Sequence, residues 1–149
     1  MDKIDEKILQ IVSLNANTPA QEIGKAVNLS IPAVNKRLQK LKGDGVIRSY
    51  TVITDSKKVM KPIVAFVLIV MQYSKDTENF LKTLNEDPDV LECYAVTGEY
   101  DYVIKIYAKS VDDFESKLLK IKRHRGVLKS HTMFALEEHK YSATVLPMQ

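Results

Sequence analysis

A basic segment in the first third of the chain carries residue types that can contact a polyanion. Residues 30–48 hold five Lys or Arg and a single acid, Asp44. The formal net charge is +3, and the whole excess lies in residues 1–50, with eight Lys/Arg and five Asp/Glu. A local positive surface of this kind suits a nucleic acid, although a solvated helix face has the same composition.

The spacing within residues 18–45 predicts a helix-turn-helix, in which two helices are joined by a tight turn. Gly24 would let the two helices approach closely, and Asn28 stands where the turn needs a positive φ. Val34 would fill the core between them. Thr18 is expected to cap the first of these helices and Ser30 the second.

In such a unit the second helix enters the major groove with its N-terminal residues facing base edges. Asn35 can bond adenine, Lys36 can reach guanine or a phosphate, and the apolar residues before them can contact thymine methyl groups. Arg37 and the later lysines are expected to hold phosphates, with a surface ion pair to an acid such as Glu22 as the alternative for Arg37. The predicted DNA-binding residues are Ser30, Ile31, Pro32, Ala33, Asn35, Lys36, Arg37, Lys40 and Lys42.

Three short helices in residues 1–50 should position this segment, the first built on apolar residues at helical spacing. Residues 51–62 are predicted to connect two domains. Residues 46–54 alternate in polarity, which fits either an extended connector or a strand. Residues 55–62 are polar, end in Pro62 and are interpreted as the linker between the domains.

Residues 63–149 repeat a strand–helix–strand unit and form the second predicted domain. Two interleaved units predict a ferredoxin-like βαββαβ domain, with a four-stranded antiparallel sheet and both helices on one face. The fold class is therefore α+β. The strands are expected at 63–72, 90–97, 101–108 and 127–136, and the helices at 76–85 and 111–123.

The first of these strands is apolar at every position from Ile63 to Met71. A half-exposed strand would alternate, so the run indicates burial on both faces. A second copy of the sheet would cover the outer face and give a face-to-face homodimer; the alternative is a further segment of this chain. The run is too short to span a bilayer, so no membrane partner is expected.

Four motifs, taken in order along the chain, resemble the Lrp/AsnC family of transcription regulators, also called feast/famine regulators. They are residues 4–9 (IDEKIL), 29–38 (LSIPAVNKRL), 97–102 (TGEYDY) and 132–138 (TMFALEE). The resemblance covers essentially the whole chain. It implies an N-terminal DNA-binding domain, a C-terminal ligand-sensing domain of the RAM/AsnC type, dimers that associate to tetramers or octamers, and an amino acid effector bound between dimers.

The same resemblance implies that the loop Gly98-x-x-Asp101 lines the effector site. Asp101 can accept a hydrogen bond from an α-ammonium group, and backbone N–H groups near Gly98 can donate to a carboxylate. The alternative is that both residues only shape a hairpin turn. The candidate effector residues are Thr97, Gly98, Glu99, Tyr100, Asp101, Thr132, Met133, Phe134 and Ala135.

Other kinds of chemistry find little support in the sequence. No catalytic triad, phosphate loop or pair of catalytic carboxylates is present, so no enzyme and no cofactor other than an amino acid effector are expected. A single cysteine and a start that does not resemble a signal peptide favour a reducing cytoplasmic location. A second basic cluster, residues 117–125, is interpreted mainly as cations favoured at a helix C-terminus. The alternative function is an oligomeric amino-acid-binding or scaffold protein that does not read DNA.

Overall fold

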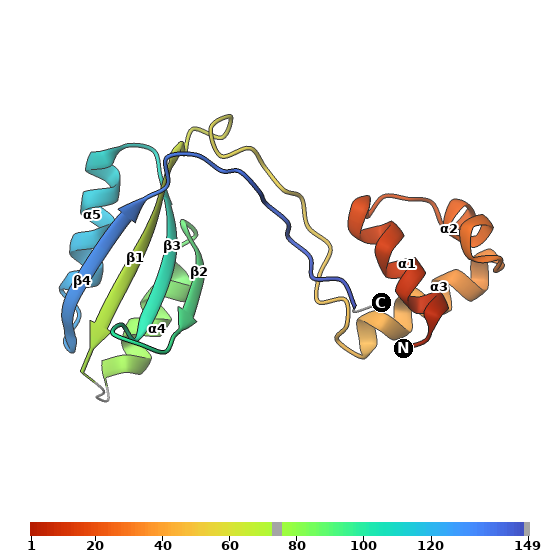
Figure 1. Ribbon diagram of the computed structural model, residues 1–149, viewed down its shortest axis with the longest axis horizontal. Coiled ribbons are helices and arrows are strands. Elements are labelled where there is room, and N and C mark those ends of the chain that lie inside the picture. Colours follow the sequence, from red (N-terminus) through yellow and green to blue (C-terminus); the bar gives the residue numbers. More distant parts are fainter. Residues whose placement is uncertain (73–75, 148–149) are drawn as a thin grey trace. The chain divides into compact units, whose positions relative to one another are not determined.

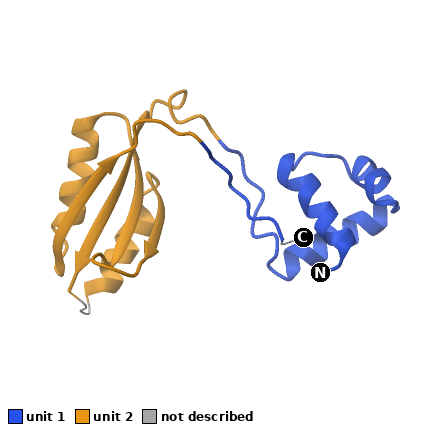
Figure 2. Ribbon diagram, in the orientation of Figure 1, with its two compact units in different colours: residues 1–53, 140–149 blue, residues 54–139 orange. Residues whose placement is uncertain are grey.

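The computed structural model describes residues 1–72 and 76–147, and the chain divides into two compact units (Figure 2). Unit 1 comprises residues 1–53 together with the C-terminal residues from 140, and unit 2 comprises residues 54–139. The sequence placed all of residues 63–149 in one domain, whereas the C-terminal residues group with unit 1. No helix in the described part of the chain is long and apolar enough to cross a membrane.

Unit 1 contains the three expected helices, α1 (Lys3–Leu14), α2 (Ala20–Val27) and α3 (Ile31–Gly43) (Figure 1). Each helix turns an apolar stripe inward, because its apolar residues recur at helical spacing. The buried side chains of this core are Ile8, Ile23, Val34, Leu41 and Ile47.

The turn between α2 and α3 depends on two residues with special backbone requirements. A Cβ atom at Gly24 would lie 2.5 Å from the carbonyl oxygen of Leu29, so only glycine fits there. Asn28 adopts φ 57° and ψ 48°, the left-handed conformation that asparagine tolerates better than most residues. Both predictions for the turn are confirmed, and Val34 is fully buried beside it.

The helix starts follow the sequence only in part. Ser30 caps α3 as predicted, with its Oγ accepting from the backbone N–H of Ala33 at 3.4 Å. The cap predicted at Thr18 is wrong: its hydroxyl donates to the carbonyl of Asn15 at 2.7 Å, and α2 begins after Pro19 without a side-chain cap.

Residues 46–62 contain neither a helix nor a strand. Of the two structures that the alternating residues 46–54 allowed, the connector is therefore the one observed. Met60, near the end of this segment, has φ 63°, a left-handed conformation that is uncommon for a residue with a Cβ atom.

Unit 2 is the expected α+β sandwich with a four-stranded antiparallel sheet in the order β2-β3-β1-β4. Both helices cover the same face of the sheet (Figure 1). Each predicted boundary lies within two residues of the observed one. The elements are β1 (Ile63–Met71), α4 (Asp76–Glu86), β2 (Val90–Ala95), β3 (Tyr102–Ala108), α5 (Val111–Lys122) and β4 (Val127–Phe134).

The two faces of β1 differ in burial although its sequence is apolar throughout. Alternate residues from Ala65 to Met71 are buried beneath the helices, in a core that includes Phe80 and Phe114. The intervening side chains are only half-buried and lie on the other face, which we call the open face. On β1 these are Val64, Phe66, Leu68 and Val70.

Candidate DNA interface and effector loop

The predicted base-reading residues gather at the exposed start of α3. Its buried stripe, which includes Val34 and Leu41, faces the core of unit 1. Of the predicted residues at this start, only Ala33 is half-buried, and the others are exposed to solvent. The exposed ones are Ser30, Ile31, Pro32, Asn35 and Lys36.

The charge along α3 also suits an anionic partner. The helix has no acidic residue between Ile31 and Gly43, whereas the first turns of α1, α2, α4 and α5 all carry acids. The free N–H groups at a helix start carry partial positive charge, which attracts phosphate when no side-chain carboxylate is nearby. Lys40 and Lys42 are exposed in the last turn and extend the positive surface.

Arg37 differs from the other cations of α3 because its guanidinium is already paired. One of its terminal nitrogens lies 2.7 Å from the carboxylate of Asp2 and 2.7 Å from that of Asp5. The ion-pair alternative for Arg37 is therefore present, with these two acids in place of Glu22. The side chain of Arg37 is 29% exposed, and that of Asp5 only 9%.

The two acids form the capping box at the start of α1. The backbone N–H of Asp5 donates to the Asp2 carboxylate at 2.8 Å, and that of Asp2 donates to the Asp5 carboxylate at 3.1 Å. The sequence reading did not identify this box, whose signal is an acid followed three residues later by another. Arg37 thus joins the middle of α3 to the first turn of α1.

Protonation equilibria agree with this geometry. The hydrogen bond from Arg37 is the main cause that lowers the pKa of Asp2. Burial alone would raise the pKa of Asp5, but hydrogen bonds from Arg37 and from the backbone of Asp2 outweigh it and leave the pKa below 3.8. Both carboxylates therefore remain ionised at neutral pH. Their negative charges offset the positive charge of Arg37 and weaken its attraction for a phosphate.

The predicted effector loop, Thr97–Asp101, lies exposed between β2 and β3. Gly98 has φ 110°, which side chains rarely allow. The Asp101 carboxylate accepts from the backbone N–H of Met71 at 2.6 Å, and the Asp101 N–H donates to the carbonyl of Ile69 at 2.8 Å. These bonds hold the shape of the hairpin turn, and the effector role of the loop stays a prediction.

Tyr100 leans from this loop toward β4. Its ring centroid lies 6.3 Å from that of His131, and the ammonium of Lys129 lies 5.7 Å from its centre. An aromatic ring and a cation therefore border the loop on the open-face side.

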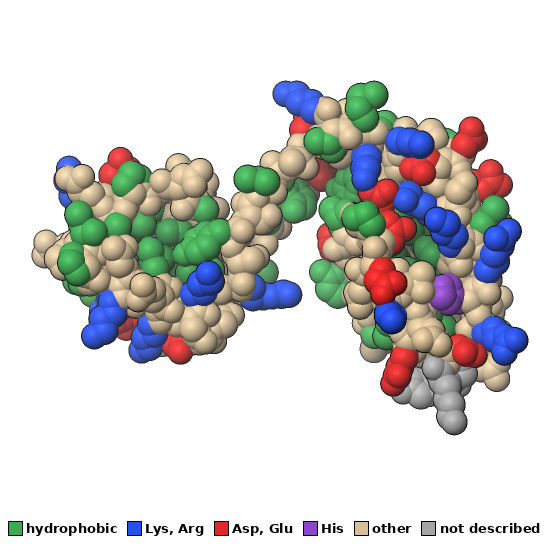
Figure 3. Space-filling model, turned by 180° about the vertical axis from the view of Figure 1, so that it is seen from behind, with side chains coloured by type: hydrophobic (Ala, Val, Ile, Leu, Met, Phe, Trp, Pro, Cys, Tyr) green, Lys and Arg blue, Asp and Glu red, His purple; other side chains and the backbone are tan. Residues whose placement is uncertain are grey.

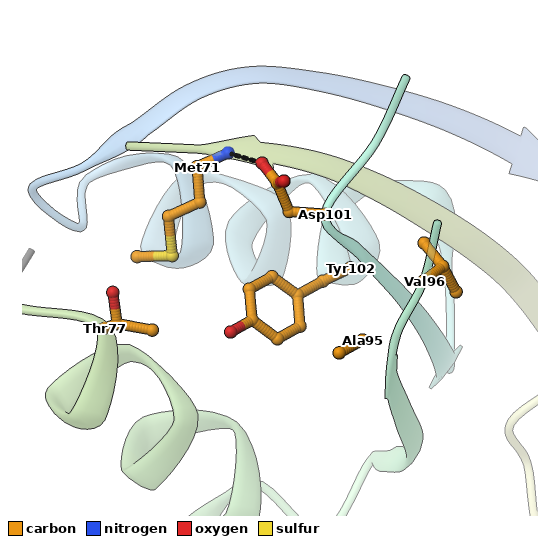
Figure 4. A pocket seen from close by; sticks show the side chains of 6 residues that line it. All are labelled: Met71, Thr77, Ala95, Val96, Asp101 and Tyr102. Atoms are coloured by element: carbon orange, nitrogen blue, oxygen red, sulfur yellow. Dashed lines mark hydrogen bonds between the residues drawn. The ribbon is translucent and has the colours of Figure 1, made fainter. Parts of the chain in front are cut away.

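A small cavity of about 260 Å³ opens beside Asp101 (Figure 4). Asp101 is the only predicted effector residue that lines it. The sequence reading missed the other lining residues, because they come from elements whose pairing is not visible in a local pattern. They are Met71, Thr77, Ala95, Val96 and Tyr102.

The C-terminal end of the second predicted effector segment, Thr132–Ala135, lies far from the loop within one subunit. Its residues alternate between the two faces of the sheet, and Phe134 packs its ring 5.0 Å from that of Phe114. Ala135 bonds to Val64, whereas the loop bonds to Ile69. Five residues of strand separate these points, about 17 Å.

The two parts of the chain match two known domain families. Residues 1–48 match a winged helix-turn-helix DNA-binding domain, and residues 64–145 match the Lrp/AsnC ligand binding domain. The HTH-type transcriptional regulator FL11 of Pyrococcus horikoshii is 34% identical over 149 residues, which cover all of this chain and 97% of that protein.

Solved structures agree over the same extent. A transcriptional regulator of Neisseria meningitidis, solved as a complex with L-Met, superposes with a TM-score of 0.92 at 29% identity, covering 97% of this chain and 96% of that one. AsnC of Escherichia coli gives a TM-score of 0.88 at 26% identity, covering 99% of both chains. With its DNA-binding and ligand-binding domains matched in this order, the chain belongs to the Lrp/AsnC family of transcription regulators.

Proposed function

We propose that this regulator reads duplex DNA with the start of α3 and that an amino acid modulates its binding. The observation that carries this proposal is the exposed first half of α3, which contains no acidic residue. This half follows a turn in which Asn28 adopts the left-handed conformation that a helix-turn-helix requires. Asn35 and Lys36 are the proposed base-reading residues, with Lys40 and Lys42 on phosphates. Because its relatives are regulators of archaea and bacteria, whose DNA lies in the cytoplasm, we place its action there.

A binding titration against the DNA upstream of its own gene tests the DNA-reading role. We expect Asn35→Ala to reduce the preference for the specific site by about 1–3 kcal/mol, the usual value of a good side-chain contact to a base. The matched control is Lys25→Ala, an exposed residue of α2 outside the proposed interface. If the wild-type chain binds no duplex at moderate salt, the alternative of an amino-acid-binding or scaffold protein replaces this function.

The proposed assembly is a homodimer formed through the open face of the sheet, with further association to tetramers or octamers. The half-buried side chains of β1 on this face continue on β2 and β4, where Tyr94 is 57% and Met133 47% exposed. Apolar side chains that are exposed together on one face of a sheet mark an interaction site. A second copy offers the same surface and forms a symmetric contact.

The proposed effector is a free amino acid held at the loop Thr97–Asp101. The relative from Neisseria meningitidis, solved with L-Met, supports this ligand class. A site between dimers would also explain why Ala135 lies so far from the loop within one subunit, because Thr132–Ala135 would then approach from another subunit.

Thermal unfolding in the presence of individual amino acids tests the effector proposal. We expect one of them to raise the melting temperature of the wild type, and Asp101→Asn to abolish that rise. Asparagine can still accept from the Met71 N–H, so the turn is kept while the charge that would pair with an ammonium is lost. Glu115→Gln, at an exposed acid of α5 outside the loop, is the control for loss of a charge in the same unit. If no amino acid raises the melting temperature of the wild type, the effector proposal is overturned.

A further inference from the structure

The zero formal net charge of residues 51–149 conceals a strong separation of charge. Residues 51–149 contain fourteen Lys/Arg and fourteen Asp/Glu. Residues 116–136 hold six of those cations and no acid, which leaves eight cations and fourteen acids in the rest. One continuous stretch is therefore strongly positive, while the remainder of residues 51–149 is acidic.

The fold gathers most of these cations at one end of unit 2. The C-terminus of α5 leads through a tight turn into β4, with the N–H of Val127 bonded to the carbonyl of His124 at 3.3 Å. Figure 3 shows Lys and Arg side chains along the α5 side of this unit. We call the exposed cations of this end the α5 edge: Lys120, Lys122, Arg123, Arg125 and Lys129.

Contacts within the domain do not neutralise the α5 edge. Lys117, one turn earlier, is paired with Asp89 at 2.8 Å and stands apart from the edge for that reason. None of the five edge residues forms an ion pair with an acid in the described ranges 1–72 and 76–147. Lys129 lies over the Tyr100 ring, a contact that leaves its positive charge intact.

The helix dipole accounts for only part of this arrangement. Cations in the last turn of a helix are favoured by the partial negative charge there, and Lys120 and Lys122 occupy that position in α5. The effect fades beyond the last turn, yet Arg125 and Lys129 lie in the following turn and strand. Like charges placed side by side repel, so a partner that binds them all would offset that cost.

We propose that the α5 edge is a second DNA-contacting surface, which holds the phosphate backbone of duplex DNA flanking the site read by α3. This proposal rests on the DNA-binding function proposed above. The edge consists of long, exposed cationic side chains and presents no helix start that could enter a DNA groove. It therefore suits contacts to the DNA phosphates and not to the bases. Duplex DNA carries one charge per about 1.7 Å, which makes it a strong match for such a surface.

The test compares two duplexes: the operator alone, as defined by footprinting, and the same operator with long flanks. The triple variant Lys122→Gln/Arg123→Gln/Arg125→Gln removes three edge charges. We expect it to bind the long duplex at least about tenfold more weakly at low salt, and its plot of log affinity against log salt to be shallower by roughly 2 to 3 units. Binding to the bare operator should be unchanged.

A matched control removes the same number of charges elsewhere in unit 2. Lys57→Gln/Lys58→Gln/Lys109→Gln changes three exposed cations outside the edge and should bind both duplexes as the wild type does. Subunit number is measured for each variant by light scattering, because the acidic remainder of a second copy is the competing partner. An unchanged subunit number in the edge variant supports DNA as the partner.

Three results would overturn the proposal in distinguishable ways. Equal salt dependence of the edge variant and the wild type on the long duplex removes the second surface but keeps the DNA-binding function. A change in subunit number assigns the edge to contacts between copies. Failure of the wild type to bind either duplex removes the proposed function itself.

Discussion

At the scale of single residues, Arg37 shows how a contact across the fold changes the meaning of a side chain. Its place on α3 suggested a phosphate contact, but its guanidinium joins the capping box of α1 at Asp2 and Asp5. We therefore infer that Arg37 is a positioning residue, which holds the recognition helix against α1, and that nearby lysines carry most of the phosphate attraction.

Removing Arg37 should separate these two roles. We expect Arg37→Ala to lower the melting temperature of the protein and to weaken DNA binding several-fold, while the slope of log affinity against log salt stays as in the wild type. A lost phosphate contact would instead make that slope shallower by about one unit. Lys40→Ala, at a proposed phosphate contact, is the comparison, and we expect the shallower slope there.

A second prediction concerns Gly24, where α2 approaches the turn that leads into α3. Gly24→Ala would place a Cβ 2.5 Å from the carbonyl oxygen of Leu29, so backbone must shift. We expect a loss of about 1–3 kcal/mol in the free energy of unfolding of unit 1, the usual cost of overpacking a fitted site. Chemical denaturation followed by circular dichroism measures this loss.

Gly43→Ala is the matched control for that change. A Cβ atom there would meet nothing within 4 Å, and Gly43 lies within α3. Alanine leaves the unfolded chain fewer conformations than glycine does. We therefore expect Gly43→Ala to leave the free energy of unfolding unchanged or to raise it slightly. Equal destabilisation by both variants would contradict the close approach at Gly24.

At the scale of helices and strands, the sequence predicted most of what local periodicity determines. The elements of unit 2 and the three helices of unit 1 follow from apolar spacing. The predicted cap of α2 was wrong because the helix begins at Ala20 with Pro19 in the cap position, so Thr18 lies one residue too early and its hydroxyl donates to the Asn15 carbonyl.

Long-range register was beyond the reach of those local patterns. The partners of Arg37, the cavity beside Asp101 and the distance from the effector loop to Ala135 all depend on which strands and helices become neighbours. No spacing within one segment reports that, so the candidate DNA residues could be grouped from the sequence while the effector residues could not.

The segment that leads into β1 is tied to the rest of unit 2 by a network centred on Asp89. This buried carboxylate pairs with Lys61 from the segment and with Lys117 from α5. Burial raises the pKa of Asp89, but the hydrogen bonds from the two lysines outweigh it and leave the pKa below 3.8.

This network should make stability depend on acid pH. A carboxyl whose pKa is lower in the folded state stabilises the protein above its unfolded value, near 3.8, and loses that contribution as the pH falls below it. We expect the melting temperature of the wild type to be level from about pH 5 to 7 and to fall below about pH 4.

Replacing the carboxylate tests whether Asp89 supplies this dependence. Asp89→Asn should lower the melting temperature at pH 7 and narrow the difference between pH 7 and pH 3. Glu115→Gln, an exposed acid of α5, should leave both values near those of the wild type. An Asp89→Asn profile parallel to that of the wild type would assign the acid dependence to other groups.

At the scale of the whole molecule, the open face of unit 2 combines apolar side chains with the ion pair of Lys105 and Glu92, and it also carries His131 and Lys129 on β4. The Lys105 ammonium lies 3.2 Å from the Glu92 carboxylate, and the Lys105 side chain is only 13% exposed even in the single subunit. Phe66 is opposite Lys105 on the neighbouring strand. A face of this composition is suited to contact with a second copy, in which the apolar residues supply area and the charged pair constrains the register.

Phe66→Glu tests the assembly as a whole. The side chain points away from the helices and is half-buried, so the core of unit 2 should remain intact while the paired surface acquires a charge in each copy. Two like charges desolvated in a symmetric contact are strongly unfavourable, and we expect light scattering to report monomers where the wild type forms dimers or larger assemblies. Affinity for an operator with two half-sites should then fall by at least about tenfold, because each recognition helix binds alone.

Val111→Glu, an equivalent change at an exposed position of α5, should preserve both subunit number and affinity. A Phe66→Glu protein with the wild-type subunit number would show that the copies associate through another surface.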